Sequence, residues 1–326
     1  MPEQWNHKVL TVKPANFEAL ALEIFRFQGG NNPVYKAWLE ALNINPVSIT
    51  SIGEVPFLPV RFFKSHTVQT TSFDPAVIFE SSGTTGTTHS RHHIKDISLY
   101  RESFKKGFEL FYGPVNEWCI IGLLPSYLER RNSSLVYMVD QLVQLSGHPE
   151  SGFYLDEFEQ LAGVLGELEK RKQKTLLIGV TFALLDFAEK YPRPLYNTVI
   201  METGGMKGRR EEMIRPEVHD LLKNAFHVPK VHSEYGMTEL LSQAYSKGEG
   251  VFNSPPWMKV SVRDEADPFV LKEVGTGTIN IIDLANVYSC SFIATDDAGT
   301  VYPDTSFEIR GRIDGSDLRG CSLMIT

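Results

Sequence analysis

Glycines and hydroxyl side chains gather in one short stretch of this sequence, residues 81–88. The stretch holds two glycines, Gly83 and Gly86, and no apolar side chain. Glycine lets the backbone turn tightly and expose its N–H groups, and hydroxyls supply further hydrogen-bond donors. With an expected strand before it (76–79) and an expected amphipathic helix after it (94–111), the stretch predicts a phosphate-binding loop. A polar surface turn is the alternative, and the lysine of the common P-loop is missing after Gly86.

A second group of polar residues follows a short predicted strand, at residues 232–239. Glu234, Tyr235 and Gly236 offer backbone and an aromatic stacking face suited to a purine. Thr238 is placed to meet a phosphate, and Glu239 is a carboxylate of the kind that holds Mg²⁺ against it. A capped helix start, with Thr238 as the cap, is the alternative, and a helix is expected after it.

Three more stretches combine glycines with charged residues: 203–210, 295–299 and 311–320. The first carries three cations, Lys207, Arg209 and Arg210, close to two glycines. The second is acidic and is also typical of a turn between strands. Each stretch alone is compatible with an ordinary loop. Evidence for a function comes from the order in which the stretches follow one another along the chain.

The elements that must position these residues alternate between strands and helices in the first part of the chain. Strands are expected over residues 76–79, 118–124, 175–179, 198–201 and 230–232. Helices are expected over residues 17–27, 33–42, 94–111, 135–145, 156–171, 181–191 and 211–226. This alternation predicts an α/β fold with a largely parallel sheet, in which ligands sit beyond the carboxyl ends of strands. Short strands joined by Gly, Pro and Asp turns follow, so we expect an α/β core over residues 1–250 and a β-rich subdomain over residues 251–326.

Composition limits the class of protein. The chain has 326 residues, 42% of them hydrophobic, and a net charge of −8. This charge argues against general binding to nucleic acid or to anionic membranes. We expect a cytoplasmic protein, because the sequence has no signal-peptide pattern, no run long enough to span a membrane, and three widely spaced cysteines. His89, His92 and His93 lack the partners of a familiar metal site, so a solvated helix start is the preferred interpretation.

The ordered motifs resemble the adenylate-forming superfamily of acyl-CoA synthetases and luciferases from about residue 56 to the C-terminus. The resemblance implies a large N-terminal-type core with parallel sheets flanked by helices, together with ATP and Mg²⁺ as cofactors. It implies roles for the phosphate loop (Ser81, Ser82, Gly83, Thr84, Thr85, Gly86), the adenine segment (Glu234, Tyr235, Gly236), the phosphate and magnesium pair (Thr238, Glu239), the ribose contacts (Asp297, Arg312) and the loop between adenine and acyl group (Gly204, Gly205).

The sequence departs from the family pattern in two ways, and these departures indicate which subgroup of the family it resembles. The lysine that usually follows the phosphate loop is absent, and Arg91 is a candidate to replace its charge. The family's mobile C-terminal domain is expected to be absent, because the chain ends shortly after Gly320. Its length and its ending around Cys321 resemble the short acyl-protein synthetases of bacterial luminescence systems, the LuxE-like proteins.

That resemblance implies activation of a fatty acid as acyl-AMP, followed by acyl transfer to Cys321 and then to a reductase partner. A nearby cation, Arg319, favours the thiolate form of Cys321, although a buried cysteine is the alternative. Cys119 and Cys290 are expected to be structural. Two other functions stay open: a ligase acting on coenzyme A or a carrier protein, with an aryl acid as in phenylacetate-CoA ligases, and a nucleotide-binding partner subunit without catalysis of its own.

Overall fold

The structure of the protein is a computed structural model. The structure describes residues 2–81, 89–125, 132–155, 157–204, 213–264, 267 and 269–313. The α-helices in these ranges are α1 (Pro2–Leu10), α2 (Phe17–Asn31), α3 (Pro33–Ala41), α4 (Phe62–Ser65), α5 (Ile97–Tyr112), α6 (Ser134–Ser146), α7 (Phe158–Lys170), α8 (Thr181–Lys190) and α9 (Arg215–Phe226). Short 3₁₀ turns are η1 (Pro14–Asn16), η2 (Ile52–Glu54), η3 (Val115–Glu117) and η4 (Leu284–Asn286).

Most strands join one large sheet. The strands are β1 (Leu58–Pro59), β2 (Val77–Glu80), β3 (Arg91–Ile94), β4 (Cys119–Leu123), β5 (Gly152–Phe153), β6 (Thr175–Gly179), β7 (Thr198–Glu202), β8 (His232–Tyr235), β9 (Ala244–Ser246), β10 (Val251–Asn253), β11 (Met258–Arg263), β12 (Leu271–Lys272), β13 (Gly275–Asp283), β14 (Phe292–Val301) and β15 (Phe307–Arg312). The sheet order is β12-β11-β13-β14-β15-β10-β9-β8-β7-β6-β4-β5, with β1 beside β14, and β2 pairs with β3 separately.

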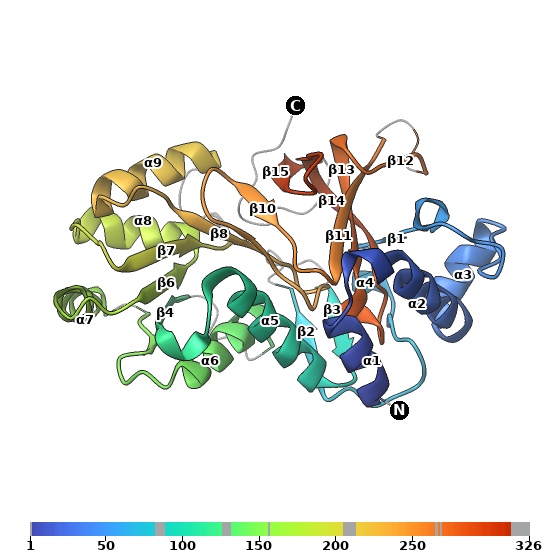
Figure 1. Ribbon diagram of the computed structural model, residues 1–326, viewed down its shortest axis with the longest axis horizontal. Coiled ribbons are helices and arrows are strands. Elements are labelled where there is room, and N and C mark those ends of the chain that lie inside the picture. Colours follow the sequence, from blue (N-terminus) through green and yellow to red (C-terminus); the bar gives the residue numbers. More distant parts are fainter. Residues whose placement is uncertain are drawn as a thin grey trace.

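The parallel part of the sheet is the predicted α/β core. Strands β4, β6, β7 and β8 pair in parallel, and every residue of β4 and β6 is buried. Helices α8 and α9 lie on one side of these strands, and α5 and α6 lie on the other (Figure 1). Covering helices on both faces explain why these strands are continuously apolar in sequence.

The antiparallel part of the same sheet comes from the later chain, from β9 to β15. It continues directly from β8 through the antiparallel neighbours β9 and β10, and β10 pairs with β15. The predicted fold class is therefore confirmed. The proposed boundary near residue 250 stays a prediction, and it falls between two paired strands of this sheet.

Three local expectations from the sequence were wrong. Residues 91–94 form a strand that pairs with β2, so the predicted phosphate loop joins a β-hairpin and does not lead into a helix. The helix starts at Ile97 because the Asp96 side chain caps it by accepting from the Ser98 amide. No helix follows Thr238, because the Leu241 amide bonds to the Asp283 carboxylate.

The acidic stretch 295–299 also differs from the simplest expectation. It is not a turn but the middle of β14, where Asp297 pairs across the sheet with Arg312 on β15. A register shift lies between Ala298 and Gly299. This bulge bends the strand pair beside the acidic residue, as bulges at functional sites often do.

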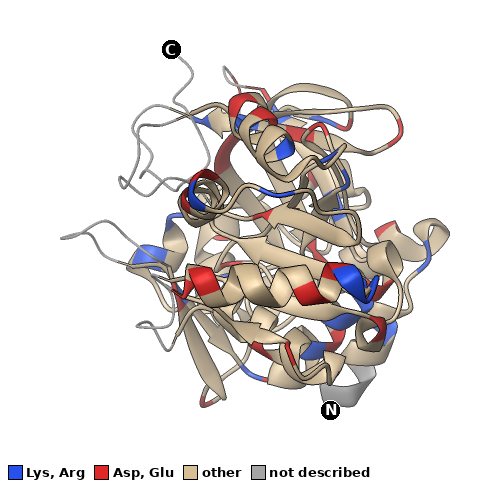
Figure 2. Ribbon diagram, turned by 90° about the vertical axis from the view of Figure 1, so that its left-hand side faces the viewer, with Lys and Arg blue, Asp and Glu red and all other residues tan. Residues whose placement is uncertain are grey.

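Charges of both signs are spread over the molecule. Lys and Arg residues are interspersed with Asp and Glu on the face shown in Figure 2. This distribution agrees with the argument from net charge against a basic nucleic-acid surface. Across the described ranges, every helix is too short or too polar to cross a bilayer.

Candidate active site

The candidate nucleotide site lies where the parallel and antiparallel parts of the sheet meet. Tyr235, at the end of β8, donates its hydroxyl hydrogen to Asp297 Oδ2 at 2.7 Å. Arg312 Nε donates to Asp297 Oδ1 at 3.2 Å, and both charged side chains are less than 10% exposed. Residues predicted for the adenine and the ribose are thus joined in one cluster, although 62 residues separate Tyr235 from Asp297.

Packing fixes the ring of Tyr235. It meets the rings of Phe252 and Phe307 edge-on, with centroids 5.9 and 5.7 Å away, and those two rings stack on each other. The guanidinium of Arg215 lies over the Phe252 ring, 5.2 Å from the ring centroid. A tyrosine held in this way is a preorganised surface for a flat ligand.

Glu234 faces the opposite side of β8 from Tyr235, as successive residues of a strand do. Its Oε2 accepts from the Thr203 hydroxyl at 2.6 Å, and its cross-strand neighbour is Tyr245. Burial and the nearby charge of Glu202 raise the pKa of Glu234 to about 7, although the Thr203 bond favours the charged form. The Tyr245 hydroxyl is buried with no hydrogen-bond partner among the described residues. The Glu234 carboxyl therefore lies in a polar but poorly hydrated part of the site.

A titration of Glu234 should be visible in the stability of the protein. Between its ordinary pKa of 4.5 and about 7, the folded state keeps a proton that the unfolded chain releases. The contribution of Glu234 to stability should therefore fall as pH rises through this window, by at most about 3.4 kcal/mol. His92 and His232, whose pKa values are lowered to about 4, contribute in the opposite direction. In denaturant unfolding measured from pH 5 to 8, the stability of Glu234→Gln should fall less, or rise more, with pH than that of wild type. The exposed Glu40→Gln serves as control and should keep the wild-type pH dependence, and an unchanged slope in Glu234→Gln would show that another group is responsible.

Glu202, at the end of β7, is the centre of a second buried network. Its Oε1 accepts from Ser233 Oγ at 2.8 Å and from Arg215 Nε at 3.1 Å, and it lies 3.5 Å from His219 Nε2. Burial alone would raise the pKa of Glu202, but the His219 hydrogen bond and the Arg215 charge outweigh it and lower that pKa to about 2. The pKa values of Glu202 and Glu234, on neighbouring strands, are thus shifted in opposite directions.

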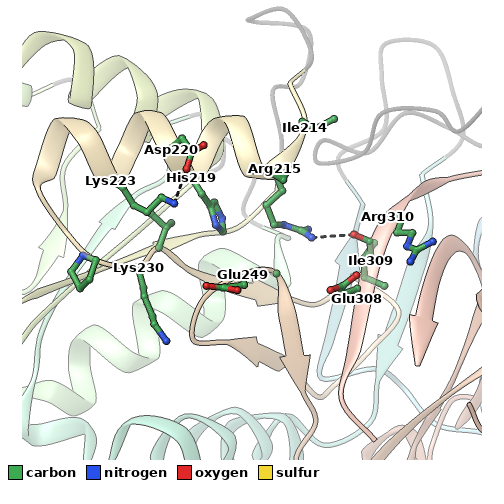
Figure 3. Close-up of a pocket in the computed structure, with 14 residues that line it drawn as sticks. Ile214, Arg215, His219, Asp220, Lys223, Lys230, Glu249, Glu308, Ile309 and Arg310 are labelled. Atoms are coloured by element: carbon green, nitrogen blue, oxygen red, sulfur yellow. Dashed lines mark hydrogen bonds and ion pairs between the residues drawn. The ribbon is translucent and has the colours of Figure 1, made fainter. Parts of the chain in front are cut away.

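Arg215 connects this network to the strand that carries Arg312. Its Nη1 donates to the Ile309 carbonyl oxygen at 3.1 Å, as Figure 3 shows. The same arginine forms part of the wall of a cavity of about 480 Å³ beside α9, β10 and β15. Basic and acidic side chains both line the cavity, so its lining does not select one sign of ligand charge. Neither Glu202 nor Arg215 was singled out from the sequence, because no motif marks them.

The stem of the predicted phosphate loop is well defined. The Ser81 amide donates to the Ser90 carbonyl at 3.1 Å, and the Ser90 amide donates to Ser81 Oγ at 3.0 Å. The Ser81 hydroxyl thus helps to close the stem, and its predicted phosphate contact stays a prediction. The other residues of the loop, namely Ser82, Gly83, Thr84, Thr85 and Gly86, lie outside the described residues.

Of the remaining predicted site residues, some are described by the structure and others are not. Gly204 is described: it adopts a positive φ of 70°, and its carbonyl accepts from the Thr181 hydroxyl at 2.6 Å. Thr238 is partly exposed, whereas Glu239 is fully buried, and the Glu239 carbonyl accepts from Asn286 Nδ2 at 2.7 Å. Gly236 is exposed beside Tyr235. Gly205, Cys321 and the cations Lys207, Arg209 and Arg210 lie outside the described residues.

Comparison with solved structures identifies the fold as that of the adenylate-forming ligases. ATP-bound MatB from Rhodopseudomonas palustris matches with a TM-score of 0.54 at 17% identity, over 73% of this chain and 48% of MatB. A 2-hydroxyisobutyryl-CoA ligase in complex with R3-HIB-AMP matches with a TM-score of 0.65 at 13% identity, over 96% of this chain and 72% of that one. This chain thus spans about half the length of MatB.

A curated relative narrows the class further. The long-chain-fatty-acid–luciferin-component ligase of Vibrio harveyi is 25% identical over an alignment of 362 positions, which covers 100% of this chain and 90% of that protein. No protein-family model matches the chain. The resemblance predicted from the ordered motifs is therefore confirmed: the chain has the fold of these ligases and is similar along its whole length to a curated fatty-acid ligase.

Proposed function

We propose that this protein activates a fatty acid with ATP and Mg²⁺ to give acyl-AMP and then transfers the acyl group to a protein cysteine thiol. The observation that carries the proposal is the cluster of Tyr235, Asp297 and Arg312 at the junction of the two sheet regions. A fatty acid is the preferred acid because the similar Vibrio harveyi protein is a long-chain-fatty-acid ligase that covers the full chain.

Each member of the cluster has a defined task in this proposal. The Tyr235 ring supports the adenine, and the Asp297 carboxylate accepts from the ribose hydroxyls. Each Asp297 oxygen already accepts one hydrogen bond and has a further lone pair for a ligand. Arg312 holds the carboxylate in place and adds positive charge near the phosphates.

We propose Glu239 as the carboxylate that holds Mg²⁺. Magnesium in nucleotide sites is usually held by one or two carboxylates together with phosphate oxygens, so one protein carboxylate suffices. Bound there, the ion would offset charge as pyrophosphate leaves. Thr238 and the loop 82–88 are proposed to bind the phosphates.

Two displacements follow from this arrangement. A carboxylate oxygen of the acid attacks the α-phosphorus of ATP, and the bond to pyrophosphate breaks. A thiolate then attacks the acyl carbon, and AMP leaves with the bonding electrons. We propose Cys321 as the thiolate. Consistent with this, Cys119 and Cys290 are fully buried, and burial raises their pKa values to about 11 and about 12, which disfavours the reactive thiolate.

The proposal predicts ATP–pyrophosphate exchange that depends on an added acid. A panel of fatty acids of increasing length and of aryl acids should show exchange with one chemical class. With that acid labelled, the protein should acquire hydroxylamine-labile label. Cys321→Ala should lose the label and keep exchange, whereas Cys119→Ala and Cys290→Ala should keep both.

Other results would assign a different function. Label that persists in Cys321→Ala would exclude this cysteine as acceptor. Exchange together with AMP release that requires coenzyme A, and no label on the protein, would identify a coenzyme A ligase. Binding of ATP without exchange for any acid would overturn the adenylation step itself.

A further inference from the structure

The buried imidazole of His92 joins two parts of the candidate site that are far apart in sequence. His92 lies on β3, one strand of the hairpin that carries the loop 82–88. Its ring is 1% exposed and packs edge-on against Phe63. His92 Nδ1 is 2.9 Å from the Thr238 carbonyl oxygen, 146 residues away, and Nε2 is 2.8 Å from Ser289 Oγ. Both ring nitrogens are therefore engaged.

The partners fix the tautomer of the ring. A carbonyl oxygen can only accept, so the Nδ1 atom of His92 carries the hydrogen and donates it to Thr238. Burial lowers the pKa of His92 to about 4, which keeps the ring neutral near pH 7. Nε2 is then an acceptor for the Ser289 hydroxyl hydrogen.

The Nε2 side of the His92 ring contacts Ser289, a residue that has further hydrogen bonds of its own. The Ser289 carbonyl accepts from Asn32 Nδ2 at 2.8 Å and from the Thr70 hydroxyl at 2.6 Å. Asn32 is itself buried and caps α3. The imidazole thus spans from a fixed support, Ser289, to the turn that carries Thr238 and Glu239.

We propose that His92 is a positioning residue that sets the Thr238–Glu239 turn against the hairpin of the phosphate loop. This inference rests on the proposed function, because it assigns Thr238 and Glu239 to the phosphates and Mg²⁺ of ATP. The hairpin and the turn come from different elements, and the His92–Thr238 bond ties one to the other directly. Loss of the Nδ1–H donor leaves the Thr238 carbonyl without this partner and frees the turn to shift.

Replacement by asparagine and by leucine separates positioning from simple packing. Asparagine keeps an N–H donor close to the place of Nδ1, whereas leucine fills space without one. His92→Leu should lower exchange activity about 10- to 100-fold and weaken MgATP binding in calorimetry, because small misplacements of reacting groups have effects of this size. His92→Asn should restore most of both. Ser289→Ala removes the support at Nε2 and keeps the Nδ1 donor, so it should show a smaller loss than His92→Leu in both measurements.

Thermal unfolding of the same variants provides the check on folding. Equal losses in His92→Leu and His92→Asn, in proportion to their thermal destabilisation, would show a packing role and overturn the inference. If wild type binds MgATP but exchanges with no acid, the proposed function fails, and the order of calorimetric affinities still decides the role of His92. If wild type does not bind MgATP at all, both proposals are overturned.

Discussion

Replacement of Asp297 by alanine is expected to weaken MgATP binding and acid-dependent pyrophosphate exchange by about 10- to 100-fold. The range corresponds to the loss of one hydrogen bond to a charged group, about 1.5–3 kcal/mol. Asp297 accepts from Tyr235 and from Arg312, so its removal releases the ring and leaves the Arg312 guanidinium buried without this carboxylate. Steady-state exchange at varied ATP concentration and calorimetric titration with MgATP measure the effect.

The neighbouring residue supplies a matched control. Asp296 points to the other side of β14 and lies 3.8 Å from Arg61, whose side chain is 74% exposed. Surface pairs of this kind contribute little, so Asp296→Ala should change exchange by less than about threefold. Similar losses in both variants would indicate a general disturbance of β14 and would remove Asp297 from the site.

The second large effect is expected for Arg215, and it concerns stability. Arg215→Met removes the cation from the Glu202 network and leaves a carboxylate that is 4% exposed beside a histidine and a hydroxyl. Breaking a buried ion pair at one partner typically destabilises a protein by about 3–5 kcal/mol. Urea unfolding near pH 7 should show a loss of this size.

Two further variants test the cause of that loss. The double variant Glu202→Gln with Arg215→Met removes the uncompensated charge and should recover part of the stability. Lys223→Met, on the same helix, removes an exposed pair with Asp220 and should cost less than about 1 kcal/mol. If Arg215→Met costs no more than Lys223→Met, the network has no special contribution to stability.

Much of the fold, and the residues that meet in the cluster of Tyr235, Asp297 and Arg312, could be predicted from sequence, because both depend on local patterns. Continuous apolar runs marked β4, β6 and β7, and short motifs in a fixed order marked Tyr235, Asp297 and Arg312. The strand–loop–helix expectation for residues 76–111 failed because a four-residue strand with two histidines carries too little periodicity to be distinguished from the start of the helix.

The parts that could not be predicted depend on contacts between distant residues. His92 reaches Thr238 across 146 residues, and Arg215 reaches Ile309 across 94. Neither residue belongs to a spaced pattern with its partner. In the structure, exposed and buried side chains alternate along residues 91–94, and this places His92 inward. The three polar residues that begin this stretch show no such alternation in the sequence.

The opposite orientation of Glu234 and Tyr235 on β8 has a consequence for the design of variants. In the proposed function, Tyr235 and its aromatic neighbours serve the nucleotide side of the site, which is needed whatever the acid. Glu234 and Thr203 lie on the other face, away from the Tyr235–Asp297 contact. Substitutions at the neighbouring positions 234 and 235 should therefore perturb different parts of the candidate site.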